Sequence, residues 1–290
     1  YLKYYSAIKA TNPDAQVGVI LCIASWDKAV MNIIKDKLDF AVIHLYPGSE
    51  ISQNKILRSP AKEIFQQILE VSVPDSEDYL NQAQTLLKET TGRDIPIAVT
   101  EYNAGLTSDH PVPFRHALGT ALVNAELLRV FMKPEHHILM ANYWQFSNSF
   151  WGMVYTNGDF MQHGYAEKLN YIKRPNYYVY ELYARHFGGT LLNAVSEGRS
   201  LSVNASKDKA ENKIYLAVLN KDMEQDVECT VNLNDFSPTG EVVAYILSGK
   251  NIDSLDADVK ETAYEIEGNS FIFTFPRHSL VFLEIKGKKL

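Results

Sequence analysis

Three consecutive apolar runs of the sequence end in side chains that could act on a ligand. Glu101 ends one run, His44 and Tyr46 end the run before it, and Trp144 and Gln145 end the run after it. A carboxylate can serve as a nucleophile or an acid–base group, and an aromatic ring can stack on the apolar face of a sugar. Burying an acid or an imidazole costs free energy unless the group is paired, so this placement is not expected by chance.

Each of these residues also has an ordinary structural interpretation. Glu101 could cap the following helix or pair with a structural arginine, His44 could be a satisfied core histidine, and Trp144 could be core. Other chemistries have less support, because the sequence lacks a G-x-S-x-G motif, a GxGxxG motif and a P-loop. The remaining histidines show no metal-ligand spacing, so we predict no metal site.

The elements that position these residues alternate between strands and helices. Strand follows helix four times, which is typical of a parallel α/β sheet, and the carboxyl ends of such strands share one edge. We predict strands at residues 17–23, 40–45, 95–101 and 137–145. We predict helices at 1–12, 26–37, 114–131 and 175–187, and two more within 60–91 that separate around Val73-Pro74-Asp75.

The pattern changes after Gly188. Short β-type runs separated by Asn, Asp, Gly and Pro predict an antiparallel sandwich over residues 189–290. The expected strands are 201–205, 213–220, 227–233, 241–247, 270–275 and 279–285. We therefore predict two domains, 1–188 and 189–290.

Composition narrows the class of protein further. The 290 residues carry a net charge of −7, which disfavours binding to a nucleic-acid backbone. Two cysteines are too few for a disulfide scaffold, and no run approaches the roughly 18 apolar residues of a membrane helix. The chain opens without Met, within a predicted helix and without a signal-peptide pattern, so we expect a piece of a longer protein and leave its compartment open.

Four segments resemble the clan A retaining glycoside hydrolases, and most closely the α-L-arabinofuranosidases of family 51. Residues 100–103 (Thr-Glu-Tyr-Asn) are similar to the end of the seventh barrel strand, and residues 38–48 to the sixth strand. Residues 174–188 resemble the last barrel helix, and residues 275–284 the closing strand of a C-terminal sandwich. The resemblance follows the chain in order over nearly its whole length.

This resemblance implies the fold and the roles of the residues. The expected fold is the C-terminal half, strands five to eight, of a (β/α)8 barrel followed by the sandwich. Glu101 would be the nucleophile of a glycosidase that cleaves α-L-arabinofuranosidic or related bonds without a metal or organic cofactor. The residues expected to bind the carbohydrate are His44, Tyr46, Tyr102, Asn103, Trp144 and Gln145.

One departure from the family pattern is important. A retaining enzyme needs a second carboxylic acid, which follows an Asn in the family, and the chain has no Asn-Glu pair. The remaining acids considered, all in predicted loops or helices, are Glu50, Glu63, Glu70 and Asp109. We therefore expect the acid/base to lie upstream of Tyr1 and the chain alone to be inactive.

An open half barrel also has two unpaired strand edges. We expect an N-terminal barrel half, from the same gene product or another chain, or a domain-swapped homo-oligomer, to complete it. The alternative function is a non-catalytic carbohydrate-binding or assembly protein derived from such an enzyme. An unrelated doubly wound enzyme is disfavoured by the absence of a phosphate-binding glycine loop.

Overall fold

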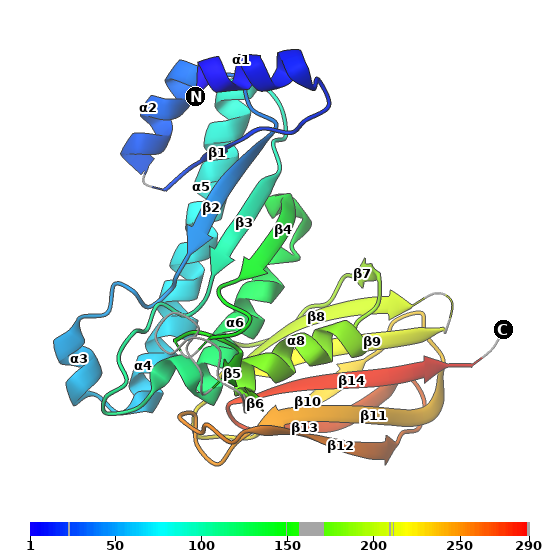
Figure 1. The fold of residues 1–290 in the computed structure, drawn as a ribbon. Coiled ribbons are helices and arrows are strands. Elements are labelled where there is room, and N and C mark those ends of the chain that lie inside the picture. Colours follow the sequence, from blue (N-terminus) through cyan, green and yellow to red (C-terminus); the bar gives the residue numbers. More distant parts are fainter. Residues whose placement is uncertain (23, 149, 157–170, 209, 211, 289–290) are drawn as a thin grey trace.

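The N-terminal part of the chain is built on a parallel sheet whose four strands lie in sequence order, β1-β2-β3-β4 (Figure 1). The computed structural model describes the chain except for residues 23, 149, 157–170, 209, 211 and 289–290. The strands are β1 (Gly18–Ile20), β2 (Phe40–Leu45), β3 (Ile97–Tyr102) and β4 (Ile138–Tyr143). Helical crossovers join these parallel neighbours, which confirms the predicted mixed α/β character.

The helices lie between and around these strands. They are α1 (Leu2–Thr11), α2 (Ala24–Ile34), α3 (Gln53–Arg58), α4 (Ala61–Gln67), α5 (Val73–Thr91), α6 (Leu118–Phe131) and α8 (Pro175–Arg185). The predicted separation around Val73-Pro74-Asp75 is wrong. A π-helical segment, Ile68–Ser72, connects α4 directly to α5. Pro74 lies in the first turn of α5, directly after the π-helical segment, and the chain stays helical through this junction.

Short turns and a two-stranded ribbon complete this part of the chain. They are the 3₁₀ turns Phe114–His116 and Pro134–His136 and the antiparallel pair β5 (Val154–Thr156) and β6 (Tyr171–Lys173). No helix within the described residues combines the length and apolar character needed to cross a bilayer.

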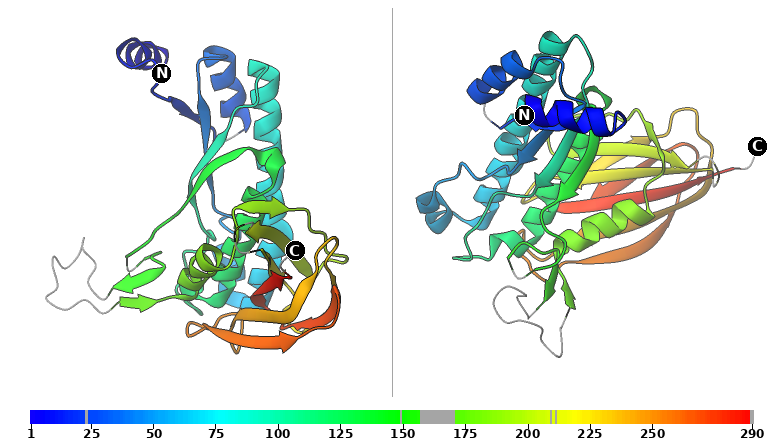
Figure 2. Two further views of the ribbon diagram at one scale, coloured as in Figure 1. Left: turned by 90° about the vertical axis from the view of Figure 1, so that its right-hand side faces the viewer. Right: turned by 45° about the horizontal axis from the view of Figure 1, so that its top comes forward.

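The two faces of the parallel sheet differ in burial. Along β2, Ala41, Ile43 and Leu45 are buried, whereas Val42 is half-buried and His44 is exposed. Helices α2 and α5 lie along the first of these faces, and no described helix lies along the opposite face (Figure 2, left). The period of two in β2 therefore separates a face packed on helices from a face open to a ligand or another chain.

The C-terminal part is antiparallel. Its strands are β7 (Thr190–Leu192), β8 (Leu201–Asp208), β9 (Lys213–Asn220), β10 (Val227–Asn232), β11 (Pro238–Ser248), β12 (Asp258–Glu265), β13 (Ser270–Phe275) and β14 (Ser279–Gly287). A six-stranded sheet has the order β12-β11-β14-β9-β8-β7, and β10 pairs with β13. The sequence did not predict β7, which is short, or β12, an edge strand with four charged residues among its eight.

The parallel and antiparallel parts pack against each other through α6 and α8. Twelve of the 14 residues of α6 are buried, because this helix lies between the two parts. The ring of Tyr183 in α8 meets Phe282 of β14 edge-on, with centroids 4.9 Å apart. His186, which follows α8, stacks on Tyr245 of β11 at 3.6 Å. One hydrophobic core accordingly continues from the parallel sheet to the antiparallel one.

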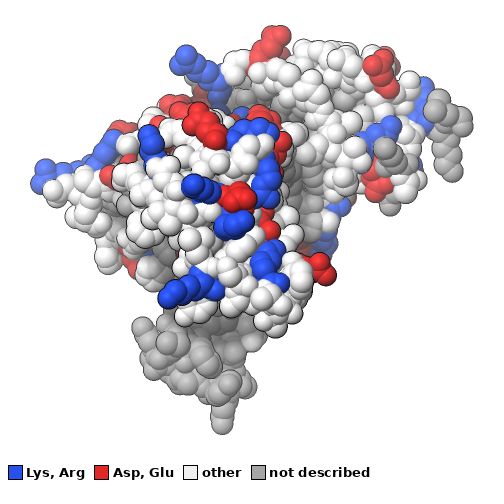
Figure 3. Space-filling view, turned by 90° about the horizontal axis from the view of Figure 1, so that it is seen from above, with Lys and Arg blue, Asp and Glu red and all other residues white. Residues whose placement is uncertain are grey.

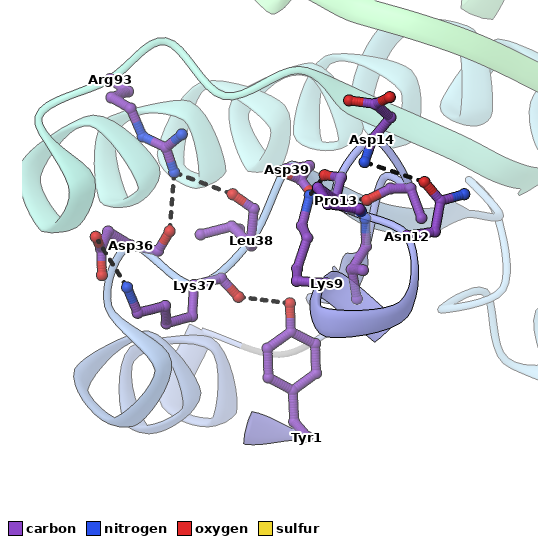
Figure 4. A network of polar contacts seen from close by, with 12 residues as sticks. Tyr1, Lys9, Asn12, Pro13, Asp14, Asp36, Lys37, Leu38, Asp39 and Arg93 are labelled. Carbon is purple, nitrogen blue, oxygen red and sulfur yellow. Dashed lines mark hydrogen bonds and ion pairs between the residues drawn. The ribbon is translucent and has the colours of Figure 1, made fainter. Parts of the chain in front are cut away.

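Helix α1 is attached differently, because none of its residues is buried. The Tyr1 hydroxyl donates to the Lys37 carbonyl at 2.6 Å, and Lys9 Nζ lies 2.8 Å from Asp39 Oδ2 (Figure 4). Burial raises the pKa of Asp39, but the hydrogen bonds from Lys9 and the Val17 N–H, together with the charges of Lys9 and Arg93, outweigh it and hold that pKa below its usual value. Lys, Arg, Asp and Glu side chains are interspersed on this end of the molecule (Figure 3), while Tyr4 is 76% exposed.

Candidate active site

Glu101 and His44 lie side by side at the carboxyl edge of the parallel sheet. A register shift between Ile43 and His44 places His44 opposite Glu101 in the β2–β3 pair. His44 Nδ1 lies 3.5 Å from Glu101 Oε2, and His44 Nε2 lies 3.0 Å from Thr100 Oγ1. Their side chains are 36% and 27% exposed, so the carboxylate is held by protein groups yet remains accessible.

Tyr46 makes the shortest contact with the carboxylate. It follows β2, and its hydroxyl donates a hydrogen bond to Glu101 Oε2 at 2.6 Å. Burial and the neighbouring carboxylate raise the pKa of Tyr46, so the phenol stays protonated and remains a donor. Both polar contacts of Glu101 within the described residues fall on Oε2, which leaves Oε1 as the freer oxygen.

These contacts bear on the structural interpretations of Glu101 and His44. Glu101 pairs with an imidazole and a phenol, and no described arginine contacts it. His44 is exposed at the sheet edge and is not a core residue. The arrangement is one in which a carboxylate is oriented by a donor, as a nucleophile or an acid–base group requires.

A tryptophan that the sequence pattern does not single out supports Tyr46. Trp151 stacks on the Tyr46 ring with centroids 5.5 Å apart, and Phe150 packs edge-on against Trp151 at 4.9 Å. The Tyr143 hydroxyl donates to the Trp151 carbonyl at 2.9 Å, and the Arg115 guanidinium lies 3.7 Å from the centre of the Phe150 ring. Trp151 lies in an irregular segment after β4, so neither strand nor helix periodicity indicates its position.

Trp144 and Gln145 directly follow β4. The Trp144 side chain remains partly exposed, at 36%. Its main-chain N–H donates to the Tyr102 carbonyl at 3.1 Å, and the peptide bond that it forms with Gln145 is cis. The carbonyl of Gln145 accepts from the Met153 N–H at 3.1 Å, which ties the following segment back to the strand end.

Tyr102 and Asn103, which follow Glu101, lie beneath the site. Both are fully buried, so their side chains present no surface to a ligand. The Tyr102 hydroxyl lies 2.6 Å from that of Tyr180, and Asn103 Nδ2 donates to the Trp144 carbonyl at 2.8 Å. Glu101 therefore lies together with its exposed neighbours, whereas Tyr102 and Asn103 lie beneath them and support them.

The other acids considered in the sequence lie apart from this group. They are Glu50, Glu63, Glu70 and Asp109. The Glu50 carboxylate accepts from Ser72, and Asp109 pairs with Arg115. Glu63 lies in the first turn of α4, and Glu70 lies in the π-helical segment. None of the four contacts Glu101 within the part of the chain that the structure describes.

The fold that carries this carboxyl edge of the parallel sheet is similar to the folds of solved glycoside hydrolases. An α-L-arabinofuranosidase from Thermotoga maritima, in a complex with arabinose, matches with a TM-score of 0.77 and 18% identity over 97% of this chain and 60% of that one. A family 51 arabinofuranosidase from Xanthomonas axonopodis pv. citri gives 0.71 and 17% over 99% and 63%. A family 44 xyloglucanase from Paenibacillus polymyxa gives 0.67 and 16% over 97% and 59%.

Sequence comparison identifies the family to which the chain belongs. The model of the alpha-L-arabinofuranosidase C-terminal domain matches residues 101–279, more than half of the chain. The chain belongs to this family, as the resemblance in the sequence implied. No curated protein matches it significantly in sequence. The chain spans about 60% of the length of the solved structures described above.

Proposed function

We propose that this chain carries the nucleophile of a retaining glycoside hydrolase that cleaves α-L-arabinofuranosidic or related glycosidic bonds. The observation that carries the proposal is the accessible Glu101 carboxylate, held on Oε2 by Tyr46 and His44 at the carboxyl edge of a parallel sheet. Barrel enzymes place their catalytic groups at this edge. Membership of the arabinofuranosidase C-terminal domain family supports the substrate class.

In this proposal Glu101 Oε1 attacks the anomeric carbon. The bond from that carbon to the leaving oxygen breaks, and the leaving oxygen takes a proton from a second carboxylic acid. Water, deprotonated by the same second group, then attacks the glycosyl-enzyme and returns Glu101 as a carboxylate. Tyr46 orients the carboxylate throughout, because its hydrogen bond is to the oxygen that does not attack.

The remaining residues bind the sugar or support the residues that do. Trp144 offers a partly exposed ring for the apolar face of a sugar, and His44 and Gln145 offer polar groups to its hydroxyls. Tyr102 and Asn103 act from beneath by holding the strand ends, since both are fully buried.

The proposed architecture is strands five to eight of a (β/α)8 barrel over residues 1–188, followed by a β-sandwich over 189–290. Sequential parallel order, helices along one face and an opposite face along which no described helix lies all support the half barrel. The antiparallel sheets share a second core, which supports the sandwich.

A complete barrel needs a further four strands and three helices, because α1 already precedes β1; these units would be supplied by the same gene product or by another chain. These units would pair with the free edges of β1 and β4, cover the exposed side chains of α1, and contribute the acid/base. The proposal therefore assigns hydrolysis to the completed assembly.

One observation favours a second candidate, a non-catalytic carbohydrate-binding protein. Within the described residues, the polar partners of Glu101 are Tyr46 and His44, and neither is a carboxylic acid that could protonate a leaving group. A binder would retain the exposed aromatic and polar groups of the site and would need no second acid.

Kinetics on the gene product that contains this chain would separate the two candidates. The test substrate is a dinitrophenyl arabinofuranoside, because its dinitrophenolate group leaves without protonation. Glu101→Ala should abolish its turnover. Added azide should restore turnover, with the glycosyl azide of inverted configuration as the product. Glu50→Gln, which changes a carboxylate that binds Ser72, is the matched control and should retain turnover. Sugar binding without turnover in the unmutated product would favour the binder.

A further inference from the structure

Three asparagine side chains meet in the core behind the site. Asn103 follows β3, Asn124 lies in the middle of α6, and Asn176 lies in the first turn of α8. All three are fully buried. Asn124 Nδ2 lies 2.9 Å from Asn103 Oδ1, from Asn176 Oδ1 and from the Thr120 carbonyl. We call Asn103, Asn124 and Asn176 the amide cluster.

The amide cluster is costly by the standards of a protein core. Two of its atoms, Asn124 Oδ1 and Asn176 Nδ2, are buried without a hydrogen-bond partner among the described residues. Each such atom loses its contact with water and gains nothing in exchange. Leucine side chains of similar volume would avoid this penalty, so the benefit of the cluster lies in the geometry that it fixes.

The geometry fixed by the cluster is the main chain of Trp144. Asn103 Oδ1 accepts from Asn124 Nδ2 and from the Ala104 N–H, both at 2.9 Å, so both of its lone pairs are used. This orients the other end of the Asn103 amide, and Nδ2 donates to the Trp144 carbonyl at 2.8 Å. The Trp144 N–H in turn donates to the Tyr102 carbonyl at 3.1 Å. The strand end that carries Glu101 thus holds Trp144 on both sides of its Cα.

We propose that Asn124 is a positioning residue that acts through Asn103 to fix Trp144 beside Glu101. Asn124 touches neither residue of the site, and it lies on a helix that packs against the antiparallel part. Its amide sets the direction of the Asn103 amide, and the Asn103 amide sets the position of the Trp144 carbonyl. The consequence for sugar binding rests on the proposed function, whereas the placement of Trp144 does not.

Emission from Trp144 tests the placement without any substrate. The chain has three tryptophans, so Trp26→Phe with Trp151→Phe leaves Trp144 as the only emitter. In this background Asn124→Leu should shift the emission to the red and raise the acrylamide quenching constant by about twofold, because the Asn103 amide that anchors the Trp144 carbonyl loses the donor that fixes its direction. Adding Asn103→Ala to Asn124→Leu should give no larger change than Asn103→Ala alone, since both act through one contact.

The matched control is Thr120→Val, on the same helix one turn earlier. It removes a buried hydroxyl that donates to the Phe114 carbonyl at 2.7 Å, a contact that does not lead to Trp144. Urea unfolding shows whether the variants lose comparable stability. Equal quenching in Thr120→Val and Asn124→Leu would overturn the proposal. If Asn124→Leu fails to fold, Asn176→Ala takes its place, since it removes only an acceptor of Asn124. We expect a smaller red shift of the Trp144 emission in this variant. An unchanged emission spectrum would also overturn the proposal.

Hydrolysis by the gene product that contains the chain supplies the separate functional readout. Asn124→Leu should raise KM more than it lowers kcat, because Trp144 is proposed to bind the sugar and Glu101 keeps its own partners. A change in Trp144 quenching in a protein that hydrolyses no glycoside would refute the proposed function and leave the positioning role intact. Unchanged quenching in an active glycosidase would refute the positioning role and leave the proposed function intact.

Discussion

Tyr46→Phe should slow the second half of the proposed reaction more than the first. The Tyr46 hydroxyl donates at 2.6 Å to Glu101 Oε2, the oxygen that becomes the ester carbonyl of a glycosyl-enzyme. A hydrogen bond to a charged acceptor is worth about 1.5–3 kcal/mol, and one to a neutral acceptor about 0.5–1.5 kcal/mol. The bond therefore strengthens by roughly 1–1.5 kcal/mol when Glu101 departs as a carboxylate, so its loss should slow deglycosylation by up to about tenfold.

The glycosylation step should respond differently. There the Glu101 carboxylate loses charge as it attacks, so the Tyr46 hydrogen bond weakens along the reaction and its removal costs mainly orientation. We expect kcat and KM to fall together while kcat/KM changes less, and a burst of dinitrophenol to mark the accumulated glycosyl-enzyme. Stopped-flow kinetics on the gene product that contains this chain would measure both phases.

Tyr79→Phe is the control for the loss of a carboxylate-bound phenol. The Tyr79 hydroxyl donates to Asp27 Oδ2 at 2.9 Å, and this pair makes no contact with Glu101. Tyr79→Phe should lower the free energy of unfolding and leave the kinetics unchanged. The reasoning fails if Tyr46→Phe shows no burst, or if its kcat/KM falls more steeply than its kcat.

Three other predictions concern stability, protonation and exchange. Glu77→Gln should lower the free energy of unfolding at pH 7 by on the order of 3 kcal/mol, because the hydrogen bond from His136, helped by Lys133, lowers the Glu77 pKa from 4.5 to about 2. This contribution to stability is present above pH 4.5 and is lost as the pH falls toward 2. In urea titrations, the free energy of unfolding of the variant should therefore fall less steeply over that window than that of the unmutated protein. Burial lowers the pKa of His116 from 6.5 to about 4, so its NMR titration should have a midpoint near 4. The free energy of unfolding should fall as the pH falls from 6.5 to 4, because the unfolded chain protonates this histidine in that range and the folded chain does not. A midpoint near 6.5 would contradict the burial of His116. In residues 1–290 without the further barrel units, amides of α1 should exchange faster than those of α6, because α1 has no buried residue there, and Lys9→Met should accelerate this exchange. Equal protection of the two helices, measured by mass spectrometry, would contradict this.

The sequence predicts which polar residues meet at the sheet edge, because the candidate site lies at strand ends. Apolar runs predict parallel strands, parallel strands share a carboxyl edge, and polar residues that end such runs meet there. This argument brings Glu101, His44 and Tyr46 together with no knowledge of packing. It also predicts Trp144 and Gln145 on the neighbouring strand, which is where β4 ends.

Other features depend on interactions that a linear pattern does not carry. The register shift at His44 decides that this residue faces Glu101, and a shift of one residue leaves the apolar pattern unchanged. Trp151 reaches Tyr46 from an irregular segment, so its role depends on tertiary packing alone. Pro74 in the sequence suggests a helix break, although the same residue is favoured in the first turn of a helix.

Helix α6 links the antiparallel sheets to the site and gives them a part in its geometry. On one side, Asn124 holds the amide network that reaches Trp144. Two residues along the helix, the Glu126 carboxylate is buried and accepts from Ser202 of β8 at 2.7 Å, with Arg129 at 2.9 Å neutralising its charge. Arg129 lies on α6 itself, so the Ser202 hydrogen bond is the contact that ties this carboxylate to β8, and moving α6 away from β8 would remove it. The antiparallel part therefore sets the position of the helix from which the strand ends of the site are held.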